Sequence, residues 1–178
     1  MTEQFRTTLG TRVDRSKAIN FIFNGKSYKG VQGDTLASAL IANGVHLVGR
    51  SFKTHRPRGI LTSGSEEPNA IIQLETGPRS EPNLRATQVE LYEGLSAKSV
   101  NCWPSVNFDV AAVNAIAGRI FVAGFYYKTF MKPSSLWMTV WEPAIRRMAG
   151  LGVLPREKDP DTYDHMNEFC EVMVVGSG

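Results

Sequence analysis

Apolar and polar side chains alternate along two short segments near the start of the chain. Ile19, Phe21 and Phe23 share one face of the first segment, and a second extended pattern covers residues 27–31. The pair Asn24-Gly25 stands between them. Because a type I′ turn needs positive φ at both central residues, Asn-Gly between two such runs predicts a β-hairpin.

In the next segment the spacing of the apolar residues changes from every second position to that of a helix. Apolar side chains recur at helical spacing in residues 36–41, with Asp34 or Thr35 placed to cap the helix and Gly44 placed to end it. A hairpin followed by a helix is the opening of a β-grasp fold.

Two more strands are expected at residues 70–75 and 86–92, with a turn rich in Gly, Pro and Ser between them. Together these elements predict an α+β domain of the β-grasp class over residues 18–95. Residues 1–17 are polar with mixed charge and are expected to form an N-terminal arm.

Beyond residue 95 the character of the sequence changes. Residues 96–170 form a predicted connecting segment of helical and irregular structure, rich in aromatic residues at first and in Asp and Pro towards its end. One helix is expected near 135–149, kinked or divided by Pro143. We expect the aromatic residues to pack against other parts of a larger protein.

The last residues carry the one cofactor motif of the sequence. An apolar run at 172–175 has the pattern of a buried strand and leads into Gly176-Ser-Gly178. A Rossmann-like dinucleotide-binding domain begins in this way: the first glycine makes the tight turn, and the second lets the pyrophosphate approach the backbone. Gly176 and Gly178 are therefore the predicted cofactor-binding residues. Because the helix that should hold the phosphate lies beyond residue 178, residues 171–178 are expected to begin a truncated domain of a longer protein.

Composition limits the possible functions. With 42% apolar and 21% charged residues the chain is expected to be globular, and a net charge of +3 is too small to argue for nucleic acid. Cys102 and Cys170 have no metal-binding spacing. The sequence shows neither a signal peptide nor an uninterrupted apolar run of membrane length, so we expect a cytoplasmic protein with no membrane partner.

Four stretches, taken together, resemble a known family. The sequence is similar to the N-terminal part of the α subunit of heterotetrameric sarcosine oxidase, from about residue 15 to residue 178. The stretches occur in the family's order: GDTLASALIANGVHLVGRSFKTHRPRGILTSGSEEPNA, AGFYYKTFMKP, EPAIRRMAGLG and VMVVGSG.

The resemblance implies a β-grasp domain of the [2Fe–2S] ferredoxin type, then a connecting segment, then a domain that binds NAD. It also implies a tetrahydrofolate-binding region further along and partner subunits β, γ and δ. In such an enzyme the β subunit oxidises sarcosine at FAD, and electrons pass to FMN at the α/β interface and on to oxygen. The products are glycine, formaldehyde and hydrogen peroxide. This segment of the oxidoreductase would be structural.

Residues 50–72 have the layout of an iron–sulfur cluster loop without its ligands. Plant-type ferredoxins hold the cluster with C-x4-C-x2-C and a more distant fourth cysteine. Aligned from Pro57-Arg58-Gly59, the corresponding positions here are Thr62, Glu67, Ala70 and Thr87. None of them carries a thiolate, the ligand that such clusters select, so neither a cluster nor another metal is expected.

The same stretch contains a basic run, formed by Arg50, Lys53, His55, Arg56 and Arg58. Three interpretations stay open. The charges are solvated, or they pair with carboxylates of another domain or subunit, or they bind the phosphate of a flavin or nucleotide.

The remaining polar candidates favour structural roles. The histidines His46, His55 and His165 have no metal or triad spacing. Glu66 and Glu67 are adjacent carboxylates that we expect to be exposed on a loop. The Tyr-Tyr-Lys at 126–128 is expected to be an interface anchor. No catalytic residue is expected in this chain.

Three rival functions remain compatible with the sequence. One is a flavin dehydrogenase or oxidase of the same subunit plan that acts on another N-methyl or secondary amine. Another is a stand-alone β-grasp interaction module. The last is an electron-transfer ferredoxin, which would require iron.

Overall fold

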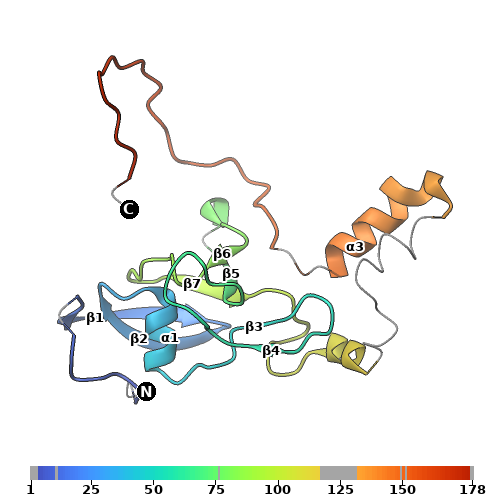
Figure 1. Cartoon of the computed structure of the whole chain (residues 1–178), viewed down its shortest axis with the longest axis horizontal. Coiled ribbons are helices and arrows are strands. Elements are labelled where there is room, and N and C mark those ends of the chain that lie inside the picture. The colour runs from blue at the N-terminus through green and yellow to red at the C-terminus, as the bar shows by residue number, and fades with distance from the viewer. Residues whose placement is uncertain are drawn as a thin grey trace.

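A computed structural model describes residues 4–10, 12–75, 77–116, 132–148, 150 and 152–176. Its centre is a five-stranded sheet in the order β2-β1-β7-β5-β6, accompanied by a two-stranded ribbon, β3-β4. The strands are β1 (Asp14–Phe23), β2 (Lys26–Gln32), β3 (Gly49–Arg50), β4 (Pro57–Arg58), β5 (Ile71–Leu74), β6 (Leu84–Arg85) and β7 (Ser96–Ser99). The described helices are α1 (Leu36–Ala42) and α3 (Glu142–Met148), with 3-10 turns at Gly77–Arg79, Val110–Ala115 and Ser134–Leu136 and a π-helical stretch at Trp137–Trp141. Figure 1 shows α1 lying across the β1-β2 part of the sheet.

The predicted hairpin is confirmed. β1 and β2 pair antiparallel, and Asn24 and Gly25 join them with φ of 51° and 76°. Phe21 and Phe23 of β1 turn into the core and are buried. β1 also pairs in parallel with β7, so the hairpin is attached to the rest of the sheet through that strand.

The helix α1 begins at Thr35 and covers the core. The Thr35 hydroxyl accepts a hydrogen bond from the Ser38 N–H, and the Ser38 hydroxyl accepts one from the Thr35 N–H. This reciprocal capping box makes Thr35 the cap, and Gly44 follows the helix with the expected positive φ of 74°. Leu36 and Leu40 are fully buried. Burying a leucine in this way stabilises the fold by about 1.5–3 kcal/mol.

The prediction of a strand at residues 86–92 is wrong. The strand in this part of the chain is the shorter β6, which pairs with β5 just before residue 86, and the chain then turns towards the start of α1. There the carbonyls of Val89 and Ala86 accept hydrogen bonds from the N–H groups of Leu36 (2.8 Å) and Ala37 (2.9 Å). The alternation itself is real, because Val89 and Leu91 are buried. The backbone carbonyls of this segment accept hydrogen bonds from the N–H groups at the start of α1, instead of pairing with a neighbouring strand.

The central strand of the sheet, β7, is one that the sequence pattern did not indicate. β7 lies between β1 and β5, although it follows residue 95, where the predicted domain ended. Its sequence, Ser-Ala-Lys-Ser, offers a single apolar residue, Ala97, which is fully buried. The five-stranded mixed sheet with α1 confirms the α+β, β-grasp class of the fold.

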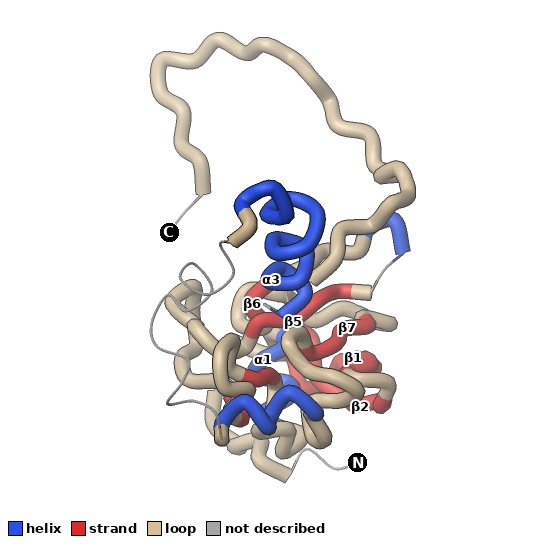
Figure 2. The backbone as a smooth tube through the Cα atoms, turned by 90° about the vertical axis from the view of Figure 1, so that its right-hand side faces the viewer, coloured by secondary structure: helices blue, strands red, loops and turns tan. Residues whose placement is uncertain are grey.

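The helix expected near residues 135–149 is present between 134 and 148. Its π-helical stretch passes into α3 at Glu142, so Pro143 stands at the junction of the two parts, where it has no N–H to donate a helical hydrogen bond. Residues 152–176 contain no helix or strand, and both views show them arching away from the sheet before the chain turns back (Figures 1 and 2). Among the described helices, none combines the length and the apolar character needed to cross a membrane.

The strand expected at residues 172–175 does not form in this structure. The exposed fraction of these side chains lies between 74% for Met173 and 87% for Val175. A strand is completed by backbone hydrogen bonds to a neighbour, and within the described ranges these residues pair with none. The Rossmann-like domain therefore stays a prediction.

Candidate functional site

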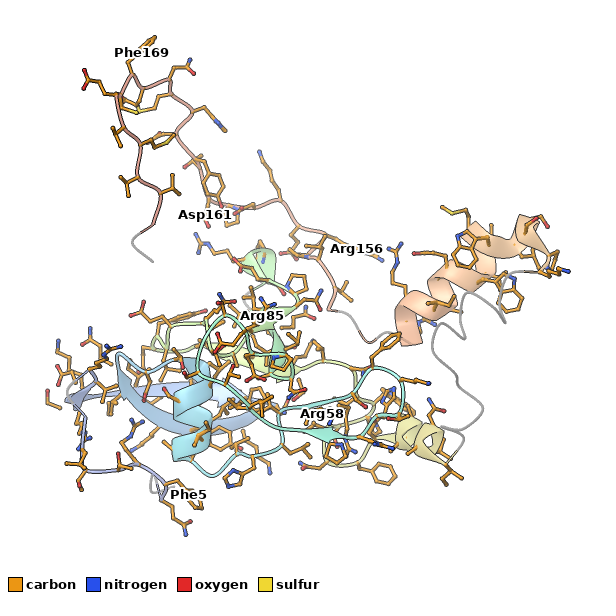
Figure 3. The ribbon with its side chains drawn as sticks, in the orientation of Figure 1. Phe5, Arg58, Arg85, Arg156, Asp161 and Phe169 are labelled. Carbon is orange, nitrogen blue, oxygen red and sulfur yellow. The ribbon has the colours of Figure 1, made fainter. Side chains whose placement is uncertain are left out.

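The stretch from Arg50 to Ile72 has two parts. β3 and β4 pair as a short antiparallel ribbon, and residues 59–70, named here the cluster loop, lead from the ribbon to β5. Arg58 ends β4 just before this loop, and Arg85 of β6 reaches it from the sheet (Figure 3). The Nε of Arg85 donates to the carbonyl of Glu67 over 3.1 Å.

The four positions aligned with cluster cysteines do come together. Thr62, Glu67 and Ala70 lie on the cluster loop, and Thr87 lies on the turn after β6. The hydroxyl of Thr87 donates to the carbonyl of Gly64 over 2.7 Å, which ties that turn to the loop. In addition, the N–H of residue 86 donates to the carbonyl of Ala70 over 2.9 Å.

Glu67 is at the centre of this loop, and the expectation that it is exposed is wrong. Its exposed fraction is 0%, whereas Glu66 beside it is exposed as expected. One carboxylate oxygen, Oε2, accepts hydrogen bonds from the N–H groups of Leu61 (2.8 Å) and Thr62 (2.6 Å), with the Thr62 hydroxyl at 3.3 Å.

The other oxygen, Oε1, accepts from the N–H groups of Asn69 (2.8 Å) and Ala70 (3.1 Å). Burial acts to raise the pKa of Glu67, but the hydrogen bonds from the N–H groups of Thr62, Asn69, Leu61 and Ala70 outweigh it, and the pKa lies below its ordinary value. The loop therefore encloses a carboxylate that is ionised at neutral pH.

These residues do not fit a [2Fe–2S] cluster. The aligned positions present two hydroxyls, a carboxylate already occupied by N–H donors and a methyl group, where the cluster needs thiolates. The two cysteines of the chain are elsewhere, Cys102 half-buried beyond β7 and Cys170 exposed on the C-terminal segment. The described ranges contain no group of three or more His, Cys, Asp or Glu that could hold a metal ion.

The members of the basic run differ in exposure: His55 is buried, Arg50 and Lys53 are half-buried, and the other two are exposed. Arg50 donates to the carbonyls of Val106 (2.9 Å) and His55 (3.1 Å), so backbone carbonyls bind its guanidinium group. Arg56 and Arg58 are exposed, and for them the choice between solvated charge and a binding role stays open.

His55 is buried, and its Nδ1 lies 2.6 Å from Oδ2 of Asp109. The side chain of Asp109 is 0% exposed, and its other oxygen accepts from the N–H groups of Trp103 (3.1 Å) and Ala111 (3.3 Å). Sequence reasoning expected a structural His55 but missed Asp109. The available signal was an Asp placed to cap the turn that begins at Val110. We name this contact the His55–Asp109 pair.

Of the predicted cofactor residues, Gly176 has a positive φ of 77°. Gly178 lies outside the described residues, as does the Tyr-Tyr-Lys at 126–128. Figure 3 shows Phe169, whose side chain is fully exposed, projecting from the same C-terminal segment away from the sheet. The structure thus brings the four cluster positions together, while a dinucleotide site remains a prediction.

Residues 16–102 match the family described as the 2Fe-2S iron-sulfur cluster binding domain. The chain is also 55% identical, over 166 residues and 93% of its length, to sarcosine oxidase subunit alpha of Rhizobium meliloti (strain 1021). The chain is a homologue of the sarcosine oxidase α subunits. The ferredoxin-like part of that homology fits the β-grasp sheet described above, including β7.

More distant sarcosine oxidase α subunits agree with this. Those of Corynebacterium sp. strains U-96 and P-1 are 30% and 31% identical over 96% and 94% of this chain. The chain spans 17% of the Rhizobium relative and 13% of each Corynebacterium relative. Among solved structures, an L-proline dehydrogenase from P. horikoshii matches with a TM-score of 0.38 and 24% identity, over 48% of this chain and 16% of that one.

Proposed function

We propose that this chain is a segment of the α subunit of a sarcosine oxidase. Such a flavoenzyme complex demethylates sarcosine oxidatively to glycine and formaldehyde and reduces oxygen to hydrogen peroxide. The observation that carries the proposal is the 55% identity to the Rhizobium subunit over 93% of the chain. In the complex, which we place in the cytoplasm, FAD and FMN carry the redox chemistry and the β, γ and δ subunits are the partners.

Within the complex the segment has a structural role. Its β-grasp core is built from apolar residues of β1, α1, β5 and β7, and hydrophobic burial of this kind needs no metal. The positions that would bind the electron-carrying cluster in a ferredoxin hold no thiolate, which argues against the ferredoxin alternative. The reacting groups therefore belong to other parts of the assembly.

Exposed aromatic side chains support a place inside a larger assembly. Trp103 and Phe108 are each 70% exposed, and Ile116 is 86% exposed. Aromatic residues are enriched at protein interfaces and often anchor them. We expect these residues to pack against the remainder of the subunit or against a partner.

The proposal includes an NAD site that begins at Gly176 and Gly178. An apolar run directly before a Gly-x-Gly supports it, because that order is typical of the first turn of a dinucleotide-binding domain. The remaining strand, helix and acidic residue of such a site would have to follow in the sequence.

The test is turnover by the purified full-length complex. With sarcosine as substrate we expect formaldehyde and hydrogen peroxide in equal amounts, and little product from dimethylglycine or proline at the same concentration. A complex that oxidises proline or dimethylglycine but not sarcosine would instead support the rival enzyme of the same subunit plan. A full-length protein without any amine oxidation would favour the interaction module.

A further inference from the structure

We propose that the carboxylate of Glu67 takes the place of an iron–sulfur cluster in this domain, as the fixed negative charge around which the cluster loop folds. The inference concerns the loop itself and does not depend on which amine the complex oxidises.

The donors of the cluster loop converge on one point. Four backbone N–H groups, those of Leu61, Thr62, Asn69 and Ala70, donate to the two oxygens of Glu67 over 2.6–3.1 Å. Converging N–H groups create a positive potential, and concavities of this kind bind anions, iron–sulfur clusters among them. A carboxylate offers two oxygens with about four acceptor sites, which matches this set of donors.

Two of the four donors belong to the cluster positions themselves. Thr62 and Ala70 stand at two of the aligned positions and donate through their backbone, while Glu67 stands at a third and supplies the anion. In a ferredoxin the N–H groups around the cluster donate to its sulfur atoms, and these hydrogen bonds and the net charge set the reduction potential of the cluster. Here the same part of the backbone is satisfied by oxygen from within the chain.

The fourth position supplies the cross-link that the metal would otherwise provide. A cluster joins its loop to a distant segment through the last cysteine. In this chain the hydroxyl of Thr87 binds the carbonyl of Gly64 at 2.7 Å, and Arg85 binds the carbonyl of Glu67 at 3.1 Å. Together with the bond from the N–H of residue 86 to the carbonyl of Ala70, three hydrogen bonds thus connect β6 and its turn to the loop.

Three of the four cluster positions are shielded from solvent. Glu67 and Ala70 are both 0% exposed, and Thr87 is 6% exposed. The loop is therefore closed over the carboxylate of Glu67. The match to a cluster-binding family and the chemistry of the site therefore disagree, and Glu67 resolves the disagreement.

The first test compares Glu67→Gln with Glu66→Gln in the full-length α subunit. Each change removes one negative charge, and the two residues are adjacent, but of the two only Glu67 is buried and accepts from the N–H groups of the loop. Glutamine keeps the size of the side chain and turns one oxygen into an NH₂ donor that faces two N–H donors. Hydrogen exchange of peptides covering residues 60–71, followed by mass spectrometry, reports on those N–H groups.

We expect exchange in this peptide to accelerate at least about tenfold in Glu67→Gln, since a buried charged hydrogen bond is lost. Glu66→Gln should exchange like the wild type. Equal exchange in the two variants would overturn the proposal, because the loop would then hold its shape without the carboxylate.

The second test asks whether Glu67 stands where a cluster would. The wild-type protein and the variant Thr62→Cys/Glu67→Cys/Ala70→Cys/Thr87→Cys are treated with ferric iron and sulfide without air, after their cysteines have been reduced. We expect no iron in the wild type and about two irons per chain, with visible absorption, in the variant. Cluster uptake by the wild type, or a folded four-cysteine variant that binds none, would refute the assignment. If that variant fails to fold, the comparison of the two glutamine variants decides.

Discussion

The His55–Asp109 pair joins the β3-β4 ribbon to the segment beyond β7, and its removal should loosen that segment. Asp109→Ala deletes the acceptor of three groups: Nδ1 of His55 at 2.6 Å and the N–H groups of Trp103 and Ala111 at 3.1 and 3.3 Å. A buried group left without its partner costs about 1–3 kcal/mol. Trp103 is exposed and Ala111 is partly exposed, so water can reach their N–H groups. If the lost contact with His55 contributes its full cost and the two backbone bonds contribute part of theirs, the variant loses about 2–4 kcal/mol of local stability.

Hydrogen exchange of residues 101–116 in the full-length protein measures this local stability directly. A loss of about 2–4 kcal/mol corresponds to exchange that is about 30- to 700-fold faster. The matched control is Asp161→Ala, which removes an exposed carboxylate paired with Arg79 and should leave the same peptide unchanged. The reasoning fails if Asp109→Ala exchanges at the rate of this control. A double-mutant cycle with His55→Ala isolates the direct contact from the two backbone bonds.

Three further predictions follow from buried charges. Folding lowers the pKa of Glu67, so the ionised carboxylate contributes its full stabilisation of the fold above about pH 4.3, and this contribution is lost as the pH falls through the pKa of the folded state. In thermal unfolding, the difference in melting temperature between the wild type and Glu67→Gln should therefore shrink as the pH falls through that range. Glu67→Met should melt below Glu67→Gln, since it leaves four N–H groups that point into the loop without their acceptor. Arg6→Ala leaves the 1% exposed Asp34 with Val31 and Ser38 as its remaining donors among the described residues, and urea unfolding should show a loss of stability of about 1–3 kcal/mol.

Local chemistry in the sequence was enough for the first elements of the fold. Asn24 and Gly25 form the turn that their tolerance of positive φ predicts, and Thr35 caps α1 through a residue three positions away. In each case the decisive interaction lies within a few residues of the signal. The parallel pairing of β1 with β7 is different, because Phe23 meets Ala97 across more than seventy positions. A strand with one apolar residue gives no local sign of such a partner.

The error at residues 86–92 has a related cause. Alternating burial shows which side chains face the core, and Val89 and Leu91 do face it. It does not show where the backbone N–H and C=O groups find partners. Here a helix start competes with the sheet, and the carbonyl of Val89 serves Leu36. Periodicity cannot distinguish these two outcomes.

The cluster loop shows how far spacing can lead. The x4 and x2 spacing was enough to find Thr62, Glu67 and Ala70, because spacing fixes which positions a folded loop brings together. It did not reveal that Glu67 is buried while Glu66 is exposed. That difference depends on which side chain the converging N–H groups reach, and it is set only when the loop closes.

The chemistry of the loop also explains why a carboxylate stands at position 67. A loop shaped for a cluster directs N–H groups inward, and these groups remain when the cysteines are gone. Four such donors, if buried without acceptors, would cost about 1–3 kcal/mol each, a large share of the 5–15 kcal/mol that keeps a domain folded. The loop must then refold, admit water or acquire an internal acceptor. Glu67 is that acceptor: its two oxygens bind all four N–H groups, and its buried charge is compensated by them rather than by a metal.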